Sequence, residues 1–238
     1  MAKSHKIADP IQIFIAPGTK PNGIQASEDG LWIIDQDDNF VYKIDWTEGK
    51  VITSFPTETV HSSGITIGGG YIWVASTYSC EIFQIEIETG KTVEKYPSPG
   101  AGINATREHL GSSSGKKSEA TGDHGLEWKN NNIYIASPPS QYVHVIDTNN
   151  WKEIHRMKAP GFRVHGIAWA KEENHIWIAD TALGVVSRHR LDDGRCYDAF
   201  RVPEPVQVHG MTIKDDVLWY ADDRGPIGKL SVDMEPSF

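Results

Sequence analysis

Three histidines stand at the same place in a repeated sequence pattern, each directly before a glycine. They are His124, His165 and His209, in the segments DHGLEW, VHGIAW and VHGMTI. Two weaker copies of the pattern, PNGIQ and SSGIT, carry Asn22 and Ser63 at that place. Three neutral imidazoles that converge would form a metal site with open coordination positions. The first chemical hypothesis is therefore a three-histidine metal centre.

The ligand type narrows the choice of metal and of reaction. Imidazole suits transition metals such as zinc and iron, whereas magnesium and calcium prefer oxygen ligands. Zinc is the first candidate, because three protein ligands plus one open position is the usual catalytic zinc arrangement. Iron and manganese stay open, since three imidazoles do not select one metal. Such an ion polarises a substrate oxygen, which indicates lyase or hydrolase chemistry on a small oxygenated molecule.

The repeated pattern also predicts the elements that position these histidines. Each copy begins with a Gly-Ile-type strand, continues through a turn rich in Gly, Asn or Asp, and reaches a second strand with an aromatic residue in a fixed place. The five second strands read LWIID, IWVAS, IYIAS, IWIAD and LWYAD. A third and a fourth short strand follow in most copies. Four short strands per repeat with turns between them are typical of a β-propeller blade.

The chain is accordingly predicted to be all-β and to form a five-bladed β-propeller with four-stranded blades. The last repeat lacks a fourth strand, so the strand at 11–16 (IQIFIA) is expected to complete it and close the ring, which removes the free sheet edge. Residues 1–10 are expected to form a flexible tail, and 11–238 a single propeller domain. The blades are expected at about 17–58, 59–99, 123–160, 161–203, and 204–238 together with 11–16.

One insertion interrupts the repeat. Residues 100–122 (GAGINATREHLGSSSGKKSEATG) separate the second and third copies. Long segments of this kind in compact domains are often functional or disordered. Either a solvated loop or a lid over the channel is consistent with the composition.

In a propeller the innermost strands line a central channel, so equivalent positions on them meet around the axis. His61, on the segment that enters the second such strand, could reach the channel mouth as a fourth ligand or a base. Glu127, three residues after His124, is predicted to orient a ligand histidine. Loops after the second strands open on the same mouth and contribute Tyr78 and Arg224, predicted as acid/base and anion-clamping groups. For the anion clamp, Arg107 and Arg163 are alternatives on the loops that enter the innermost strands.

Composition disfavours two classes of partner and suggests a compartment. The 238 residues carry a formal net charge of −9, and the basic residues are scattered. Nucleic acids and anionic membranes are therefore not expected as partners, because phosphate binding needs a basic face. The N-terminal sequence MAKSHKIADP lacks the apolar core of a signal peptide, and no apolar run approaches the length of a membrane span. A cytoplasmic protein with a small-molecule substrate is expected, and the oligomeric state stays open.

The recurring Gly-Ile and Leu-Trp-x-Ala-Asp segments resemble those of the virginiamycin B lyase-like and NHL-type propellers. The resemblance covers nearly the whole chain and implies the propeller fold. Within that group, the resemblance implies different ions: magnesium in virginiamycin B lyase, calcium in gluconolactonase-like members, and zinc held by three histidines in peptidyl-α-hydroxyglycine α-amidating lyase. The set His124, His165 and His209 looks most like the last of these. Five blades differ from the six or seven of the group.

Two alternatives stay open beside the lyase or hydrolase. One is a three-histidine iron or manganese oxygenase. The other is a non-catalytic propeller that binds a ligand or a partner protein, with histidines that serve only the fold. The two blades that lack the histidine form the same strand without it, so the repeat itself does not require the imidazole.

Overall fold

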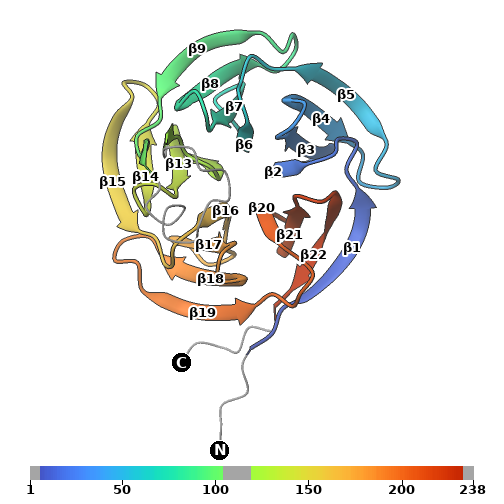
Figure 1. Cartoon of the computed structure of the whole chain (residues 1–238), viewed down its shortest axis with the longest axis vertical. Helices are drawn as coiled ribbons and strands as arrows, with labels where there is room; N and C mark the ends of the chain where they lie inside the picture. The colour runs from blue at the N-terminus through green and yellow to red at the C-terminus, as the bar shows by residue number, and fades with distance from the viewer. Residues whose placement is uncertain (1–5, 104–118, 233–238) are drawn as a thin grey trace, which may run out of the picture.

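The computed structural model describes residues 6–103 and 119–232, and all regular elements in these two ranges are β-strands. They form five four-stranded antiparallel sheets and one two-stranded hairpin. Figure 1 shows the five sheets arranged as blades around a central axis. The prediction of an all-β, five-bladed propeller with four-stranded blades is confirmed.

Each of the first four blades uses four consecutive strands, which run from the axis to the outer edge. Blade 1 contains β2 (Pro21–Ser27), β3 (Gly30–Asp35), β4 (Phe40–Ile44) and β5 (Val51–Pro56). Blade 2 contains β6 (Ser62–Gly68), β7 (Tyr71–Ser76), β8 (Glu81–Glu86) and β9 (Thr92–Pro97). Blade 3 contains β12 (Leu126–Lys129), β13 (Asn132–Ser137), β14 (Tyr142–Asp147) and β15 (Lys152–Lys158). Blade 4 contains β16 (Val164–Trp169), β17 (His175–Asp180), β18 (Val185–Arg190) and β19 (Cys196–Arg201).

Blade 5 joins the two ends of the chain. It contains β20 (Val208–Lys214), β21 (Val217–Asp222) and β22 (Pro226–Ser231), and its outermost strand is β1 (Asp9–Ile15). Strand β1 pairs antiparallel with β22, with Ile11 opposite Lys229. The predicted closure of the ring by the N-terminal strand is confirmed (Figure 1).

The residues just before β1 are also packed, although residues 1–10 were expected to be a tail. Ile7 forms a β-bridge with Arg201, and Ala8 is buried. The Lys6 ammonium lies 3.0 Å from the Asp198 carboxylate of blade 4. Residues 6–10 therefore belong to the folded domain, because blade 4 supplies their partners. The rest of the expected tail, 1–5, lies outside the described residues.

The hydrophobic core lies between neighbouring blades. Five buried clusters fill the five interfaces, and the fixed aromatic of each second strand packs into one of them. These aromatics are Trp32, Trp73, Tyr134, Trp177 and Trp219. Trp73, for example, stacks on Trp128 of the next blade at a centroid distance of 5.6 Å. One aromatic per repeat therefore joins each blade to the next.

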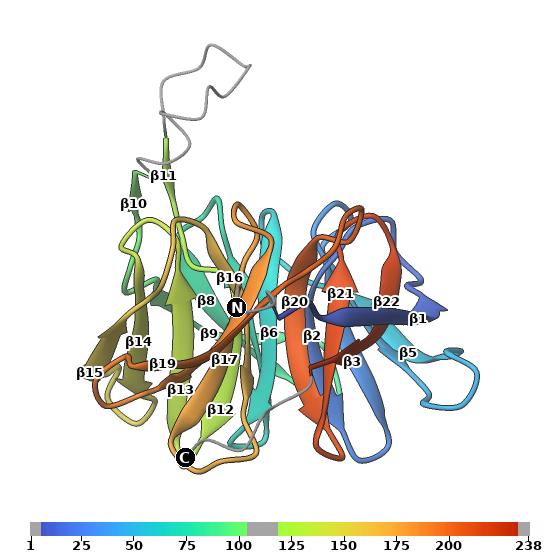
Figure 2. The same ribbon diagram turned by 90° about the horizontal axis from the view of Figure 1, so that it is seen from below.

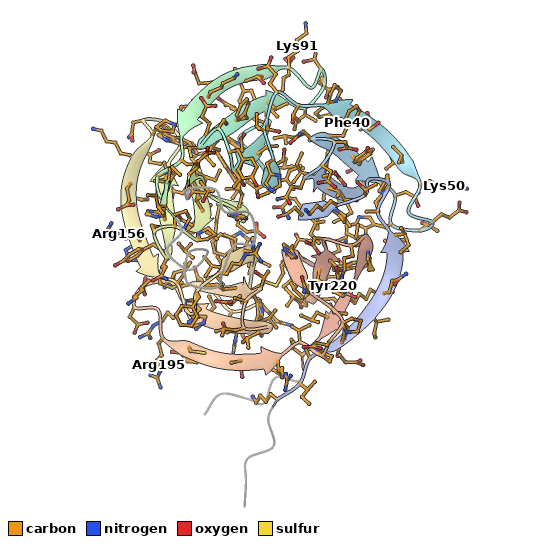
Figure 3. All side chains as sticks on the ribbon, viewed as in Figure 1. Phe40, Lys50, Lys91, Arg156, Arg195 and Tyr220 are labelled. Atoms are coloured by element: carbon orange, nitrogen blue, oxygen red, sulfur yellow. The ribbon has the colours of Figure 1, made fainter. Side chains whose placement is uncertain are left out.

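Charged side chains occupy the outer edge of the ring. Figure 3 shows Lys50, Lys91, Arg156 and Arg195 pointing away from the blades, whereas Tyr220 lies among them. Tyr220 is only 1% exposed, in the cluster between blades 4 and 5. The outermost strands also expose apolar side chains, for example Ile13, Ile52 and Ile154.

The insertion contributes a short hairpin, in which β10 (Gly102–Ile103) pairs with β11 (Ala120–Thr121). Figure 2 shows this hairpin rising from one face of the ring. The centre of the insertion, 104–118, lies outside the described residues, so the choice between lid and solvated loop stays open, and Arg107 falls in the same segment. No helix in the described part of the chain is long and apolar enough to cross a membrane.

Candidate functional site

A β-bulge lies at the residue before the strand glycine in blades 1, 2, 4 and 5. In β16, the two residues His165 and Gly166 lie opposite the single residue Ala179, and in β20 the pairing register slips by one residue at His209. The same slip occurs at Asn22 and Ser63. A bulge adds an unpaired residue and re-aims its side chain. The repeated pattern therefore brings these side chains to one level of the channel.

The three predicted metal ligands come together on this level. The ring centroids of His124 and His165 are 4.1 Å apart, and those of His165 and His209 are 4.8 Å apart. His165 is 2% exposed and His209 is 3% exposed. Both ring nitrogens of His165 are buried and have no hydrogen-bond partner. An imidazole in this state costs free energy unless a ligand or an ordered water occupies the site.

The strand glycines close the channel below the histidines. A methyl group on Gly125 would lie 2.1 Å from the carbonyl oxygen of His165, and one on Gly64 would lie 1.9 Å from that of His124. Glycine is needed because each innermost strand packs directly against the backbone of the next. Only about 10 Å³ of space remains between the five strands. The histidines thus form the floor of a cavity that opens on one face only.

Replacing Gly125 with alanine is expected to destabilise the fold by about 1–3 kcal/mol, the usual cost of overpacking a tight interior. The added methyl group would push the backbone of blade 3 away from His165. A Gly102→Ala variant is the control, because the nearest atom to its new methyl group is 3.9 Å away. Urea denaturation of the two variants measures the difference. Equal midpoints would show that the blades can separate at the axis without cost.

The cavity above the histidines has a volume of about 240 Å³. Its lining combines the three histidines with nine other residues, which are Lys20, Asn22, Gln36, His61, Thr77, Tyr78, Thr121, Arg163 and Asp223. The lining is almost wholly polar, and the size suits a small molecule. Arg163, one of the predicted alternatives for an anion clamp, is part of it.

Register explains most of this lining. Lys20, His61 and Arg163 occupy one equivalent position, three residues before the strand glycine. A second equivalent set, Gln36, Thr77 and Asp223, follows the last residue of the second strand. Equivalent positions of the blades meet around the axis, so the side chains of these two sets converge for the same reason as the histidines. Lys20 was missed in the sequence because this argument was used for only one position of the repeat.

The other predicted site residues divide into two groups. His61 and Tyr78 both line the cavity, and their rings stack at a centroid distance of 4.1 Å with an angle of 2°. Arg224 does not line it. The Nε atom of Arg224 donates a hydrogen bond of 2.7 Å to Asp222, and its Nη2 atom donates to the carbonyl of Pro205. Asp223, one residue earlier, faces His209 instead, with 3.5 Å between Oδ2 and Nε2.

Glu127 lies below the cavity, on the level of Gln25, Thr66 and Thr212 in the other blades. It is 2% exposed and does not line the cavity. Burial raises the pKa of Glu127 to about 8, although the backbone N–H groups of Trp128 and Trp169 oppose this shift. Its predicted action on a ligand histidine stays a prediction.

The electrostatics keep the floor of the cavity neutral. Burial lowers the pKa of His165 well below its ordinary value, and the neighbouring His124, His209 and Arg163 lower it further. Burial also lowers the pKa of His209, against the opposing effect of Asp223. A neutral imidazole keeps a lone pair, which is the form that binds a metal.

The three histidine side chains do not point at one common metal position. Among the described residues, no group of three or more His, Cys, Asp or Glu side chains has the geometry to hold a metal ion. The rings of His124 and His165 instead meet edge to face, at an interplanar angle of 71°. Their side chains would have to rotate before they could share an ion.

No protein-family model matches the chain, and no curated protein sequence matches it. Solved structures do resemble it. Glutaminyl cyclase from Myxococcus xanthus matches with a TM-score of 0.73 and 8% identity over 96% of this chain and 97% of that one. A streptogramin B lyase matches with a TM-score of 0.57 and 17% identity over 98% and 100% of the two chains. Virginiamycin B lyase from Staphylococcus aureus matches with a TM-score of 0.54 and 20% identity over 97% of this chain and 75% of that one.

Identities this low show a shared fold and nothing finer. The predicted resemblance to virginiamycin B lyase-like propellers is confirmed at that level. The comparison with the amidating lyase rests on the histidine set alone and stays a prediction.

Proposed function

We propose that this propeller is a metal-dependent enzyme whose ion is held by His124, His165 and His209 at the floor of the cavity. The observation that carries the proposal is the state of His165. Both of its ring nitrogens are buried without a hydrogen-bond partner, between two further imidazoles. A fold that used this histidine only structurally would be expected to satisfy at least one of those nitrogens.

The donor set fits a transition metal, with zinc as the first candidate and iron or manganese as the others. The Nδ1 atom of His209 lies 3.3 Å from the carbonyl oxygen of Gln207. A hydrogen bond donated there leaves the lone pair on Nε2, which is the usual state of a ligand histidine. The carboxylate of Asp223 beside Nε2 adds an oxygen donor. Rotation of the three rings would complete the arrangement.

The reaction that suits this cavity is a lyase or hydrolase reaction on a small oxygenated molecule. A bound divalent ion would polarise an oxygen of the substrate. His61 and Tyr78 form one wall of the cavity, and either could donate or accept the proton that such a reaction moves. Polar side chains such as Gln36 and Thr77 would orient the substrate through hydrogen bonds. The structural neighbours that share this fold are, by name, a cyclase and two lyases, so the fold is one that enzymes use.

Two other functions remain as alternatives. A three-histidine iron or manganese oxygenase would use the same ligands, and the metal found would separate it from the zinc enzyme. A non-catalytic propeller that binds a ligand or partner would hold no stoichiometric metal. The chain is expected to act in the cytoplasm on a small molecule, without nucleic acid or membrane.

Metal analysis tests the proposal directly. Protein purified without chelator is expected to contain about one transition-metal ion per chain by plasma mass spectrometry. Dialysis against a chelator should remove the ion and lower the melting temperature, because a ligand bound only by the native state stabilises that state. Adding zinc back should restore the melting temperature. A chain without stoichiometric metal, and with no response to zinc, would exclude this whole class of function.

A further inference from the structure

The charges inside the cavity differ in sign from the charge of the whole chain. The protein carries a formal net charge of −9. Among the described residues that line the cavity, however, Lys20 and Arg163 are cationic, and Asp223 is the single carboxylate. The cations outnumber the carboxylate whether the histidines are neutral or protonated. A cleft with an excess of one sign concentrates ligands of the opposite sign.

The two cationic side chains start from fixed backbone positions. The backbone N–H of Lys20 donates a 2.6 Å hydrogen bond to the buried carboxylate of Asp35. The backbone N–H of Arg163 donates a 3.0 Å hydrogen bond to Asp180, which is also buried. The same two carboxylates accept further backbone hydrogen bonds from the loops that follow them. Blades 1 and 4 thus present a cation at the same level through the same local structure.

Both cationic residues belong to the cavity lining. The Arg163 charge acts on His165 and His209, since it lowers the pKa of both imidazoles. The Lys20 ammonium lies 3.9 Å from the carboxylate of Asp37, an exposed residue outside the described lining. Asp223 lies beside His209, at 3.5 Å, and so is shared with an imidazole. An anion in the cavity would therefore meet two cations.

The face on which the cavity opens carries exposed apolar side chains. The loops on this face carry four of the large hydrophobic side chains that are exposed in the described residues, namely Val60, Tyr78, Phe162 and Leu183, and Ile103 of β10 is also exposed. Tyr78 is 49% exposed and also stacks on His61 inside the cavity. At the opposite face, Val51 and Val217 are exposed at the first residues of β5 and β21. Tyr78 is the one of these residues that belongs to the described lining, so its ring offers an apolar surface to a ligand in the cavity.

We infer that the substrate is a carboxylate that bears an aromatic or similarly flat apolar group, with Arg163 and Lys20 as the carboxylate-binding residues. This inference rests on the proposed function in taking the cavity as the substrate site, and it does not depend on the identity of the metal. The guanidinium of Arg163 can bind a carboxylate through two parallel hydrogen bonds, and the Lys20 ammonium adds a second charge. The apolar group would lie along the wall made by His61 and Tyr78.

Titration calorimetry with phenylacetate and phenylacetamide tests the inference, because the two probes have nearly the same shape and differ in charge. The native protein is expected to bind phenylacetate at least about tenfold more tightly than the amide, and high salt should reduce the difference. Arg163→Gln and Lys20→Gln should each remove most of the preference. Arg156→Gln is the control, since this arginine points away from the blades at the outer edge of the ring (Figure 3) and lies outside the cavity lining. Melting curves of all three variants check that they fold.

The outcomes separate this inference from the proposed function. Equal affinity for the acid and the amide, no saturable binding of phenylacetate, or unchanged preference in Arg163→Gln would overturn the inference, even in a protein that contains its metal. Preference for phenylacetate that depends on Arg163, in a protein that contains no metal, would support the inference while the metal-dependent function fails. Repeating the titration with and without chelator shows, in one preparation, whether the cavity prefers the carboxylate and whether this preference needs a metal.

Discussion

Replacing His165 with alanine is expected to abolish stoichiometric metal binding and to leave the propeller folded. His165 is the middle imidazole of the three, so its loss leaves His124 and His209 without the ligand between them. Metal affinity should fall by more than about 100-fold, since even an outer partner of a ligand is worth roughly 10–100-fold. Metal content by plasma mass spectrometry and zinc titration of the chelated protein measure the change.

The stability of the metal-free protein should change little in the same variant. The ring nitrogens of His165 make no hydrogen bond, so the substitution leaves no new partner unsatisfied. Unfolding in chelator is expected to differ from that of the native chain by less than about 1 kcal/mol. His175→Ala in the same blade is the matched control, because its ring binds the carbonyl of Glu173 away from the cavity. Loss of folding in His165→Ala, with metal content unchanged, would instead favour a purely structural histidine.

The fold was predictable because the information for each blade is local and repeated. Every copy of the pattern supplies strand periodicity, turn residues and one aromatic, and the structure places that aromatic at a blade interface in each case. The three histidines were predictable for a related reason. Positions with the same register on the innermost strands must meet at the axis, whatever their distance along the chain.

The register of the strands does not predict which side chains of the loops at the cavity mouth face the axis. Arg224 and Asp223 are adjacent, and only one of them can face the axis. The structure turns Asp223 inward because Asp222 binds the guanidinium of Arg224. Similarly, Lys6 is held by Asp198, which is 192 residues away in the sequence. Contacts between side chains of different blades carry no signal in a single sequence.

Glu127 is a buried carboxyl group at a position where the other blades carry uncharged residues. Its position holds Gln25, Thr66 and Thr212 in other blades, and these three are joined by hydrogen bonds of 3.3 Å and 2.8 Å through Gln25. A neutral polar residue is therefore accommodated at this level of the channel. Glu127 instead carries a carboxyl group, 2% exposed, that the folded protein would have to ionise without water.

Glu127→Gln is expected to stabilise the protein at neutral and alkaline pH and to have little effect near pH 4. Burial raises the pKa of Glu127 from an ordinary 4.5 to about 8. Between these two values the unfolded chain loses the proton and the folded chain keeps it, so folding stability falls as the pH rises through this range. The amide of glutamine does not ionise in this range, so the variant does not lose this stability as the pH rises. The gain at pH 7 is on the order of 3 kcal/mol.

Urea denaturation of the two proteins from pH 4 to pH 9, followed by tryptophan fluorescence in the presence of a chelator, measures this difference. Comparing the curves isolates Glu127, because the histidines and the other carboxylates titrate alike in both proteins. The difference in free energy of unfolding should grow steadily from about pH 4.5 and level off above about pH 8, where the folded chain also ionises. Glu88→Gln, at an exposed turn, is the control. Parallel curves for Glu127→Gln and the native chain would mean that water or a cation reaches this carboxylate, and that it is ionised in the folded protein.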